Sequence, residues 1–167
     1  FFRINNFYNS PLLYVPENTQ ISLDKGLIII GGCGAGKTSI VKTVVEVIKS
    51  LSLNHHEVPV RMHNTLDIVH EYEKTEFEFR TEVIKKYSKG FRIFDDVKNE
   101  PEASNYGKSD ILSKILYLRC ESRNFRTIML CNYDSEESKN MKQAIESFDR
   151  YGDRVFDRLF EAFNFVQ

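Results

Sequence analysis

The sequence predicts an α/β fold, in which a five-stranded parallel sheet carries helices on both faces. Two observations favour this class: short apolar runs alternate along the chain with helical stretches, and a glycine-rich loop separates the first run from the first helix. Strands that alternate with helices are typical of parallel sheets. With 167 residues, the chain is long enough for one domain with a sizeable core.

The glycine-rich loop is the most informative stretch of the sequence. The apolar run 27–30 precedes it as a buried strand, and a helix over 37–51 follows it, with an apolar face that we list as Ile40, Val44, Val47 and Ile48. The loop Gly31-x-x-x-x-Gly36-Lys37-Thr38 fits the phosphate-binding loop, or P-loop, in full. Such a loop points its backbone N–H groups at phosphate oxygens, next to a helix N-terminus.

Each loop position has an expected role in binding ATP and Mg²⁺. Lys37 would supply a positive charge for the β- and γ-phosphates, and Thr38 would offer its hydroxyl to Mg²⁺. The glycines permit positive φ angles and close approach of the backbone. The predicted nucleotide-binding residues are Gly31, Gly32, Cys33, Gly34, Ala35, Gly36, Lys37, Thr38 and Ser39.

The other elements are expected in regular order after the first helix. The pattern predicts strands at 58–62, 91–96, 127–131 and 163–166, and helices at 64–72, 76–88, 109–125, 136–148 and 153–163. Asn64 and Ser135 are plausible N-caps of two of these helices. Two helices between the second and third strands exceed the single crossover that a parallel pair needs.

Polar residues at the ends of two later strands extend the expected site. Asp95 and Asp96 end the third strand in the manner of a Walker B motif, and Asn132 follows the fourth. In an open α/β sheet, ligands gather at the carboxyl ends of the strands. We expect Asp95 to hold the Mg²⁺ shell through water and Asp96 to polarise the attacking water. Asn132 would orient that water or sense the γ-phosphate.

Composition limits the other functions of the chain. Its net charge of −1 means that the chain as a whole has no excess of positive charge, so any nucleic-acid contact must be local. Two basic clusters could track phosphates or be solvated helix faces; they comprise Arg80, Lys85, Lys86, Lys89 and Arg92, and Arg119, Arg123 and Arg126. Three scattered cysteines favour a reducing interior, hence the cytoplasm. We expect no membrane span.

Three segments resemble the AAA+ ATPases of the DnaC helicase-loader and IstB transposition-helper group. Asp95-Asp96-Val97, with Glu100-Pro101 and Tyr106-Gly107, resembles the group's Walker B region. The stretch 127–133, Thr-Ile-Met-Leu-Cys-Asn-Tyr, is similar to its sensor 1 strand, and 151–159 is similar to box VII. The resemblance extends from about residue 25 to the end of the chain. Residues 1–24 would form a lead-in segment, with a possible role as a cap on the adenine side.

This resemblance implies an assembly and a partner. Numbering the five parallel strands along the chain, the expected sheet order is 5-1-4-3-2. Arg158 would reach the nucleotide of a neighbouring subunit in a ring or spiral of identical chains, with Arg154 as the second choice. The partner would be a replicative helicase, loaded onto single-stranded DNA. The alternative within the group is a transposase partner.

The sequence also departs from the group. Asp96 stands where most AAA+ motors have Glu, so we expect slow hydrolysis or a nucleotide-gated switch with negligible turnover. Glu100 would be the next candidate for the catalytic acid. A helical lid with its sensor 2 arginine is expected to be absent or minimal, and the chain, which begins at Phe1, is expected to be part of a longer protein. The alternative from another class is a P-loop nucleotide or small-molecule kinase.

Overall fold

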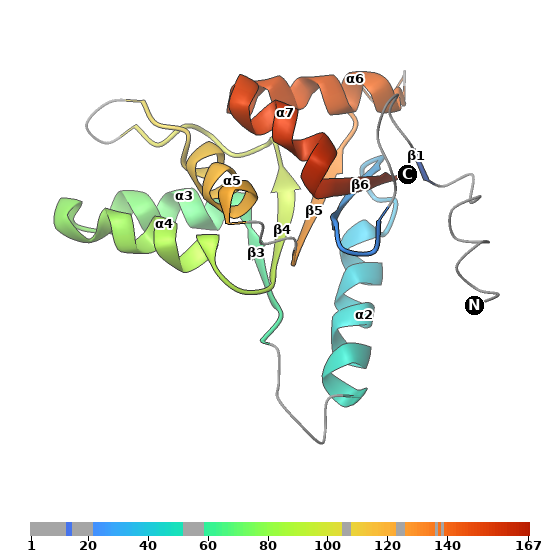
Figure 1. The fold of residues 1–167 in the computed structure, drawn as a ribbon, viewed down its shortest axis with the longest axis horizontal. Coiled ribbons are helices and arrows are strands. Elements are labelled where there is room, and N and C mark those ends of the chain that lie inside the picture. The colour runs from blue at the N-terminus through green and yellow to red at the C-terminus, as the bar shows by residue number, and fades with distance from the viewer. Residues whose placement is uncertain are drawn as a thin grey trace.

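A six-stranded sheet forms the centre of the molecule in the computed structural model (Figure 1). The structure describes residues 13–14, 22–51, 59–104, 108–122, 126–135, 137 and 139–167. The strands are β1 (Leu13–Tyr14), β2 (Gly26–Gly31), β3 (Arg61–Asn64), β4 (Arg92–Val97), β5 (Thr127–Asn132) and β6 (Phe163–Val166). Their order is β1-β6-β2-β5-β4-β3.

The predicted order of the five parallel strands is confirmed. In the numbering of the prediction, β6-β2-β5-β4-β3 is the order 5-1-4-3-2, and each of its neighbouring pairs is parallel. The sequence did not predict β1, which pairs antiparallel with β6 at one edge of the sheet. Most of the lead-in segment 1–24, including its possible role as a cap on the adenine side, lies outside the described residues.

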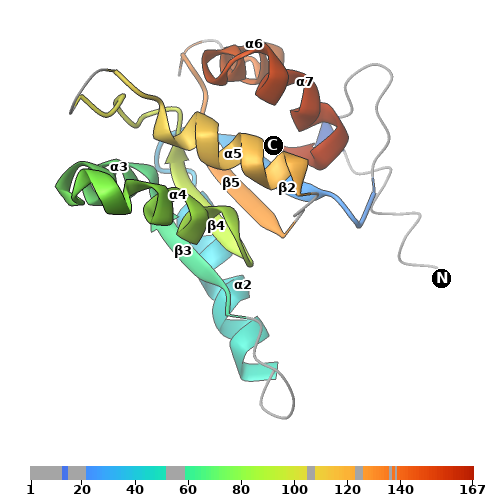
Figure 2. The ribbon, with the colours of Figure 1, turned by 60° about the vertical axis from the view of Figure 1, so that its left-hand side comes forward.

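The helices cover the two faces of the sheet unequally. They are α2 (Lys37–Leu51), α3 (Thr65–Lys74), α4 (Arg80–Ser88), α5 (Ile111–Glu121), α6 (Met141–Glu146) and α7 (Asp153–Ala162), with short 3₁₀ turns at Phe77–Phe79 (η1) and Ser147–Tyr151 (η2). Of these helices, α2 packs alone on one face, whereas α3 to α7 pack on the other (Figures 1 and 2). The larger part of the core therefore lies beneath α3 to α7.

The helix α2 has the predicted bounds, but its buried face differs from the prediction. Its side chains Val41 and Val45 are buried against the sheet. The four residues predicted to share its apolar face, Ile40, Val44, Val47 and Ile48, are 37 to 63% exposed. Lys37, at the start of the helix, must face the strand ends, and this fixes which side of the helix faces the sheet. Residues four positions apart share a face, so Val41 and Val45 lie on the same side as Lys37 and are buried.

Further boundaries differ from the prediction. The helix predicted at 76–88 is the 3₁₀ turn η1 followed by α4, and the one predicted at 109–125 is α5, Ile111–Glu121. The second parallel strand, predicted at 58–62, is displaced toward the C-terminus, to Arg61–Asn64. The helix predicted from residue 136 begins only at Met141, and its N-cap is Asn140 rather than Ser135. Lys139 has a positive φ of 41°, which is incompatible with a helix that runs through it. The predicted cap Asn64 is confirmed, since its side chain accepts a hydrogen bond from the N–H of Leu66.

Arg119, which was predicted to lie in a basic surface cluster, is 1% exposed. Its guanidinium donates to Oγ1 of Thr127 at 2.8 Å and to the carbonyl oxygen of Tyr87 at 2.9 Å. It also donates to the carbonyl oxygens of Gly90 and Arg126, at 2.9 and 3.0 Å. Burial lowers the pKa of Arg119 to about 10, and the nearby Arg92 acts in the same direction. Arg119 thus joins α5 to the ends of α4 and β5.

The other members of the two predicted basic clusters do not form a continuous surface. Arg80 and Arg92 are buried, and their guanidinium groups donate to backbone carbonyl oxygens. Lys85 and Lys86 pair with Glu82 and Glu71. Arg123 lies outside the described residues. The prediction of two phosphate-tracking clusters is therefore wrong for the three buried arginines. Within the described residues, no helix has the length and apolar character needed to cross a bilayer.

We expect Arg119→Met to destabilise the fold strongly, because it leaves buried carbonyl oxygens without a donor. The free energy of unfolding should fall by about 2–4 kcal/mol, measured by urea denaturation. Arg126→Met, at an exposed arginine, is the matched control and should change it by less than about 0.5 kcal/mol. Equal stability of the two variants would contradict the assigned role of Arg119.

Candidate functional site

The ammonium group of Lys37 holds the P-loop against the ends of two strands. It donates to the carbonyl oxygens of Gly31 and Gly32, at 2.9 and 2.8 Å. The third hydrogen bond, of 2.8 Å, goes to Oδ1 of Asn132. A lysine ammonium has three donors, so all three are used. Two residues that the sequence proposed for one site are therefore in direct contact.

The glycines of the loop leave open space for a ligand. Gly34 and Gly36 have φ angles of 73° and 85°, a region that favours glycine. A Cβ atom built on Gly32, Gly34 or Gly36 would meet no other atom within 4 Å. Packing against the protein therefore does not require glycine at these three positions. The positive φ angles of Gly34 and Gly36 already favour glycine, and the open space beside all three lets the N–H groups of the loop approach a phosphate closely. The loop residues therefore fit a bound phosphate group.

A cavity of about 270 Å³ lies in front of the loop. It is lined by Cys33, Gly34, Ala35, Gly36, Lys37, Thr38, Ser39, Asp95, Asp96, Leu130 and Asn132. Seven of the nine predicted nucleotide-binding residues are among them, together with the predicted residues of both strand ends. Gly31 and Gly32 line the neighbouring cavity described below. The sheet thus brings together every predicted site residue except Arg158.

Thr38 and Asp95 form the part of the cavity that fits a divalent cation. Oγ1 of Thr38 lies 3.1 Å from both carboxylate oxygens of Asp95. Burial raises the pKa of Asp95, the hydrogen bond from Thr38 lowers it, and the charge of Asp96 raises it. No group of three or more His, Cys, Asp or Glu side chains that could hold a metal occurs among the described residues. A single carboxylate and a hydroxyl suit Mg²⁺, which completes its shell with water and phosphate oxygens.

Asp96 sits in an unusual backbone conformation, with a φ of 59°. The pairing of β4 with β5 shifts register between Phe94 and Val97, so Asp95 and Asp96 have no register partner in β5. Oδ2 of Asp96 accepts a hydrogen bond of 2.9 Å from Nδ2 of Asn64. Such a conformation persists only when its surroundings hold it. Asn64 therefore belongs to the candidate site.

The sequence predicted Asn64 only as a helix cap. Its oxygen does cap α3, while its nitrogen holds Asp96, so a single amide serves both elements. The strand predicted at 58–62 stopped short of Asn64, whereas in the structure Asn64 ends β3 and is the register partner of Asp95, near the end of β4. Polar residues at the carboxyl ends of adjacent parallel strands meet at one edge.

A second cavity of about 560 Å³ adjoins the first and shares Cys33 and Ala35 with it. Its other lining residues are Ile30, Gly31, Gly32, Tyr133, Lys139 and Gln167. A ligand that fills the first cavity can therefore continue into the second without leaving the P-loop.

Glu100, the second candidate for the catalytic acid, is absent from the lining of both cavities. It is 3% exposed, and its Oε1 accepts a hydrogen bond of 2.6 Å from the hydroxyl of Tyr151. That hydroxyl also accepts from the N–H of Lys98, at 3.0 Å. Burial raises the pKa of Glu100, against the lowering effect of the bond from Tyr151. Glu100 thus stabilises the segment behind Asp96 and does not face the cavity.

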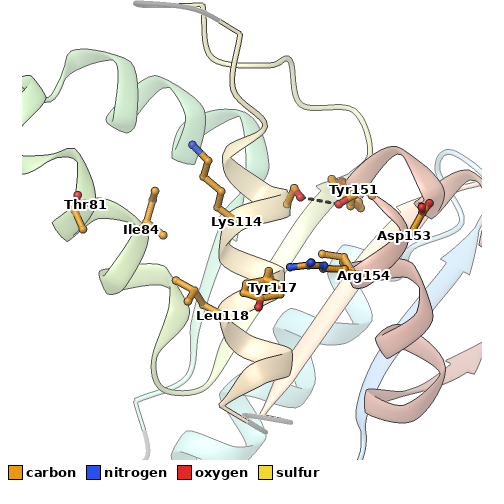
Figure 3. A pocket seen from close by; sticks show the side chains of 11 residues that line it. Thr81, Ile84, Lys114, Tyr117, Leu118, Tyr151, Asp153 and Arg154 are labelled. Carbon is orange, nitrogen blue, oxygen red and sulfur yellow. Dashed lines mark hydrogen bonds between the residues drawn. The ribbon is translucent and has the colours of Figure 1, made fainter.

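Arg158 lies on α7 and is not among the residues that line either cavity of its own chain. Its Nη2 lies 2.6 Å from Oε1 of Glu121, and both side chains are about two-fifths exposed, at 43 and 41%. Arg154, one turn earlier, lines a groove between helices (Figure 3). The structure therefore places neither arginine at the two cavities beside the P-loop of its own chain.

Comparison with known proteins supports the same fold. No family model matches the chain, and no curated protein matches its sequence. Among solved structures, it is similar to the crystal structure of the DnaC helicase loader, with a TM-score of 0.58 and 19% sequence identity. The similarity covers 99% of this chain and 87% of that chain. The resemblance to the DnaC group is thus confirmed at the level of the fold.

We expect Lys37→Ala to abolish nucleotide binding while the protein still folds. The variant loses the cation that faces the cavity, along with its three hydrogen bonds. Titration with a fluorescent ATP analogue should show at least about a hundredfold weaker binding, the loss of a strong charge-assisted contact. Lys42→Ala, at an exposed lysine of the same helix, is the control and should bind as the wild type does. Unchanged affinity in Lys37→Ala would contradict the assignment of the loop.

Glu100→Gln tests the structural role of Glu100. Its pKa is raised in the folded state, so folding favours the protonated form. The stabilising contribution of Glu100 is therefore present at low pH and is lost as the pH rises through its folded pKa. Gln cannot ionise, so the variant should lose less stability than the wild type between pH 4 and pH 7, measured by urea denaturation. Its ATP hydrolysis should be retained. Abolished hydrolysis in a stably folded variant would instead make Glu100 catalytic.

Proposed function

We propose that the chain binds ATP with Mg²⁺ at the carboxyl edge of its sheet and hydrolyses it slowly. The observation that carries this proposal is the convergence of the P-loop, Asp95, Asp96 and Asn132 on one cavity. Lys37 and Asn132 meet on one side of it, and Thr38 meets Asp95 on the other. A kinase needs an additional pocket for a phosphate acceptor. The residues around this cavity suit a water nucleophile.

The residues of the cavity have separate roles in this mechanism. Lys37 would exchange its protein acceptors for the β- and γ-phosphate oxygens. Thr38, together with Asp95 acting through water, would hold Mg²⁺, which would neutralise charge on the phosphate oxygens. Asp96, after leaving Asn64, accepts a hydrogen bond from the attacking water and polarises it. Asn132 orients the same water or the γ-phosphate.

The neighbouring cavity is proposed to hold the nucleoside. It begins at the same P-loop residues and extends toward Tyr133 and Lys139. Its volume of about 560 Å³ is in the range of small-molecule sites. Tyr133 offers an aromatic ring, and Lys139 offers a donor for the ribose or the base. No feature of this cavity favours adenine over guanine, so ATP is inferred from the resemblance of the motifs.

The biological task is proposed to be the loading of a replicative helicase onto single-stranded DNA. The similar fold of the DnaC helicase loader supports this proposal. A transposase is the alternative partner. DNA contacts would fall to the exposed lysines Lys85, Lys86 and Lys89, since the arginines beside them are buried.

The active assembly is proposed to be a ring or spiral in which Arg158 acts on the neighbouring nucleotide. Its half-exposed position, away from its own P-loop, supports this role. To reach a neighbour, Arg158 must leave Glu121. An ion pair with this exposure contributes at most about 1 kcal/mol, so the release is inexpensive.

Asp96→Asn should retain ATP binding but stop hydrolysis, since the amide carries no charge to polarise water. Asp95 still holds Mg²⁺ in the variant. We expect a single-turnover rate at least about a hundredfold lower, the range of a lost general base, with the ATP affinity unchanged. An unaffected rate would remove Asp96 from the mechanism.

Arg158→Ala should bind ATP normally but hydrolyse it about 10³-fold or more slowly, as expected for an arginine finger. Arg126→Ala is the matched control and should remain active. The decisive measurement is a mixture of Arg158→Ala with Lys37→Ala, because some interfaces then combine an intact P-loop with an intact arginine. Partial recovery of ATPase activity is expected. A mixture that assembles by light scattering yet stays inactive would contradict a role in trans.

A further inference from the structure

A groove of about 680 Å³ lies between α4, α5 and the start of α7 (Figure 3). Its floor is apolar and is formed by Ile84, Tyr117, Leu118 and Val155. Leu118 is 39% exposed, although it is a large apolar side chain. An apolar groove of this size, open on one side, is suited to receive side chains of a partner.

The rim of the groove carries positive charge that the described residues do not neutralise. Lys114 and Arg154 line it, and neither forms an ion pair within the described part of the chain. The side chain of Arg154 extends toward Tyr117 across the groove (Figure 3). Asp153 also lies on the rim, so the net charge of the three side chains is +1. An occupant with apolar side chains between acidic ones would complement this surface.

The same chain carries a segment of that description. The acidic aromatic tip, residues 76–79, joins α3 to α4 and reads Glu-Phe-Glu-Phe. Phe79 is 57% exposed and Phe77 is 75% exposed. Glu76 and Glu78 are exposed as well. Large aromatic side chains at this level of exposure, flanked by carboxylates, match the apolar floor and the basic rim of the groove.

We propose that the groove of one chain receives the acidic aromatic tip of a second copy. A chain cannot fill its own groove, because α4 carries both features, the tip just before its first turn and the groove along its flank. Phe79 would be the anchor on the floor of the groove. Glu78 would face Arg154 and Lys114, which adds specificity to the contact. Since tip and groove are different surfaces, the contact can repeat from head to tail.

The contact would touch the segment that supports Asp96. Tyr151 and Ser113 both line the groove. The hydroxyl of Ser113 donates to the carbonyl oxygen of Tyr151 at 2.7 Å. The side chain of Tyr151 holds Lys98 and Glu100, which follow Asp96 in the chain. This contact differs from the one proposed for Arg158 and requires no nucleotide.

The test is sedimentation velocity of nucleotide-free protein over a range of concentrations. Phe79→Ser in the tip and Leu118→Glu in the groove should each raise the dissociation constant of self-association at least about tenfold. Val44→Ser, at an apolar residue of α2 that is 49% exposed, is the matched control and should leave it unchanged. Thermal unfolding establishes that each variant is folded, and Lys114→Glu replaces Leu118→Glu if that variant is not.

A charge reversal identifies the pairing itself. Glu78→Lys and Arg154→Glu should each weaken association, and the two changes in one chain should restore it at least in part. A wild type that stays monomeric at all concentrations, a control that weakens association equally, or a double variant without recovery would overturn the proposal. If the wild type stays monomeric, an acidic helix of another protein would be the remaining candidate to bind the groove. Lys37→Ala should associate as the wild type does, so failed ATP binding and failed docking are distinguishable.

Discussion

The register of the parallel strands is the constraint on which the site depends. Gly31 at the end of β2 lies opposite Asn132 of β5, and Asn64 of β3 lies opposite Asp95 of β4. Four strands thus deliver polar groups to one edge without any long loop to position them. A shift of one residue in either pairing would turn these side chains to the other face of the sheet. The buried core beneath α3 to α7 opposes such a shift.

Hydrogen bonds within the protein hold the groups proposed for catalysis. Lys37 is held by loop carbonyl oxygens and Asn132, Thr38 by Asp95, and Asp96 by Asn64. Each of these contacts joins a residue of the cavity to a different element of the fold. A bound nucleotide that exchanged several of them at once would therefore act on α2, β4 and α3 together. The hydrogen bond from Asn64 to Asp96 also connects the proposed catalytic acid to α3, which Asn64 caps and which the acidic aromatic tip joins to α4.

The sequence predicted the fold and the parts of the site that follow from local pattern. The P-loop, the strand-end acids and Asn132 are local signals, and strand order followed from the family resemblance. The sequence-based prediction was wrong where contacts between distant parts of the chain determine whether a side chain is buried. Because Arg119 is charged, it was predicted to lie on the surface, but four acceptors around its guanidinium allow its burial. The apolar face of α2 was misplaced because Lys37 fixes the phase of the helix. The bond from Asn64 to Asp96 joins residues 32 positions apart, and no local pattern reports it.

The central claim is that this edge of the sheet binds a nucleoside triphosphate together with a divalent cation. Isothermal titration of the wild-type chain with ATP, in the presence and in the absence of Mg²⁺, tests it most directly. We expect one site per chain, with micromolar affinity and tighter binding when Mg²⁺ is present, because Thr38 and Asp95 then contribute through the metal. No measurable heat under either condition, with weak binding excluded by a fluorescent ATP analogue, would contradict the claim.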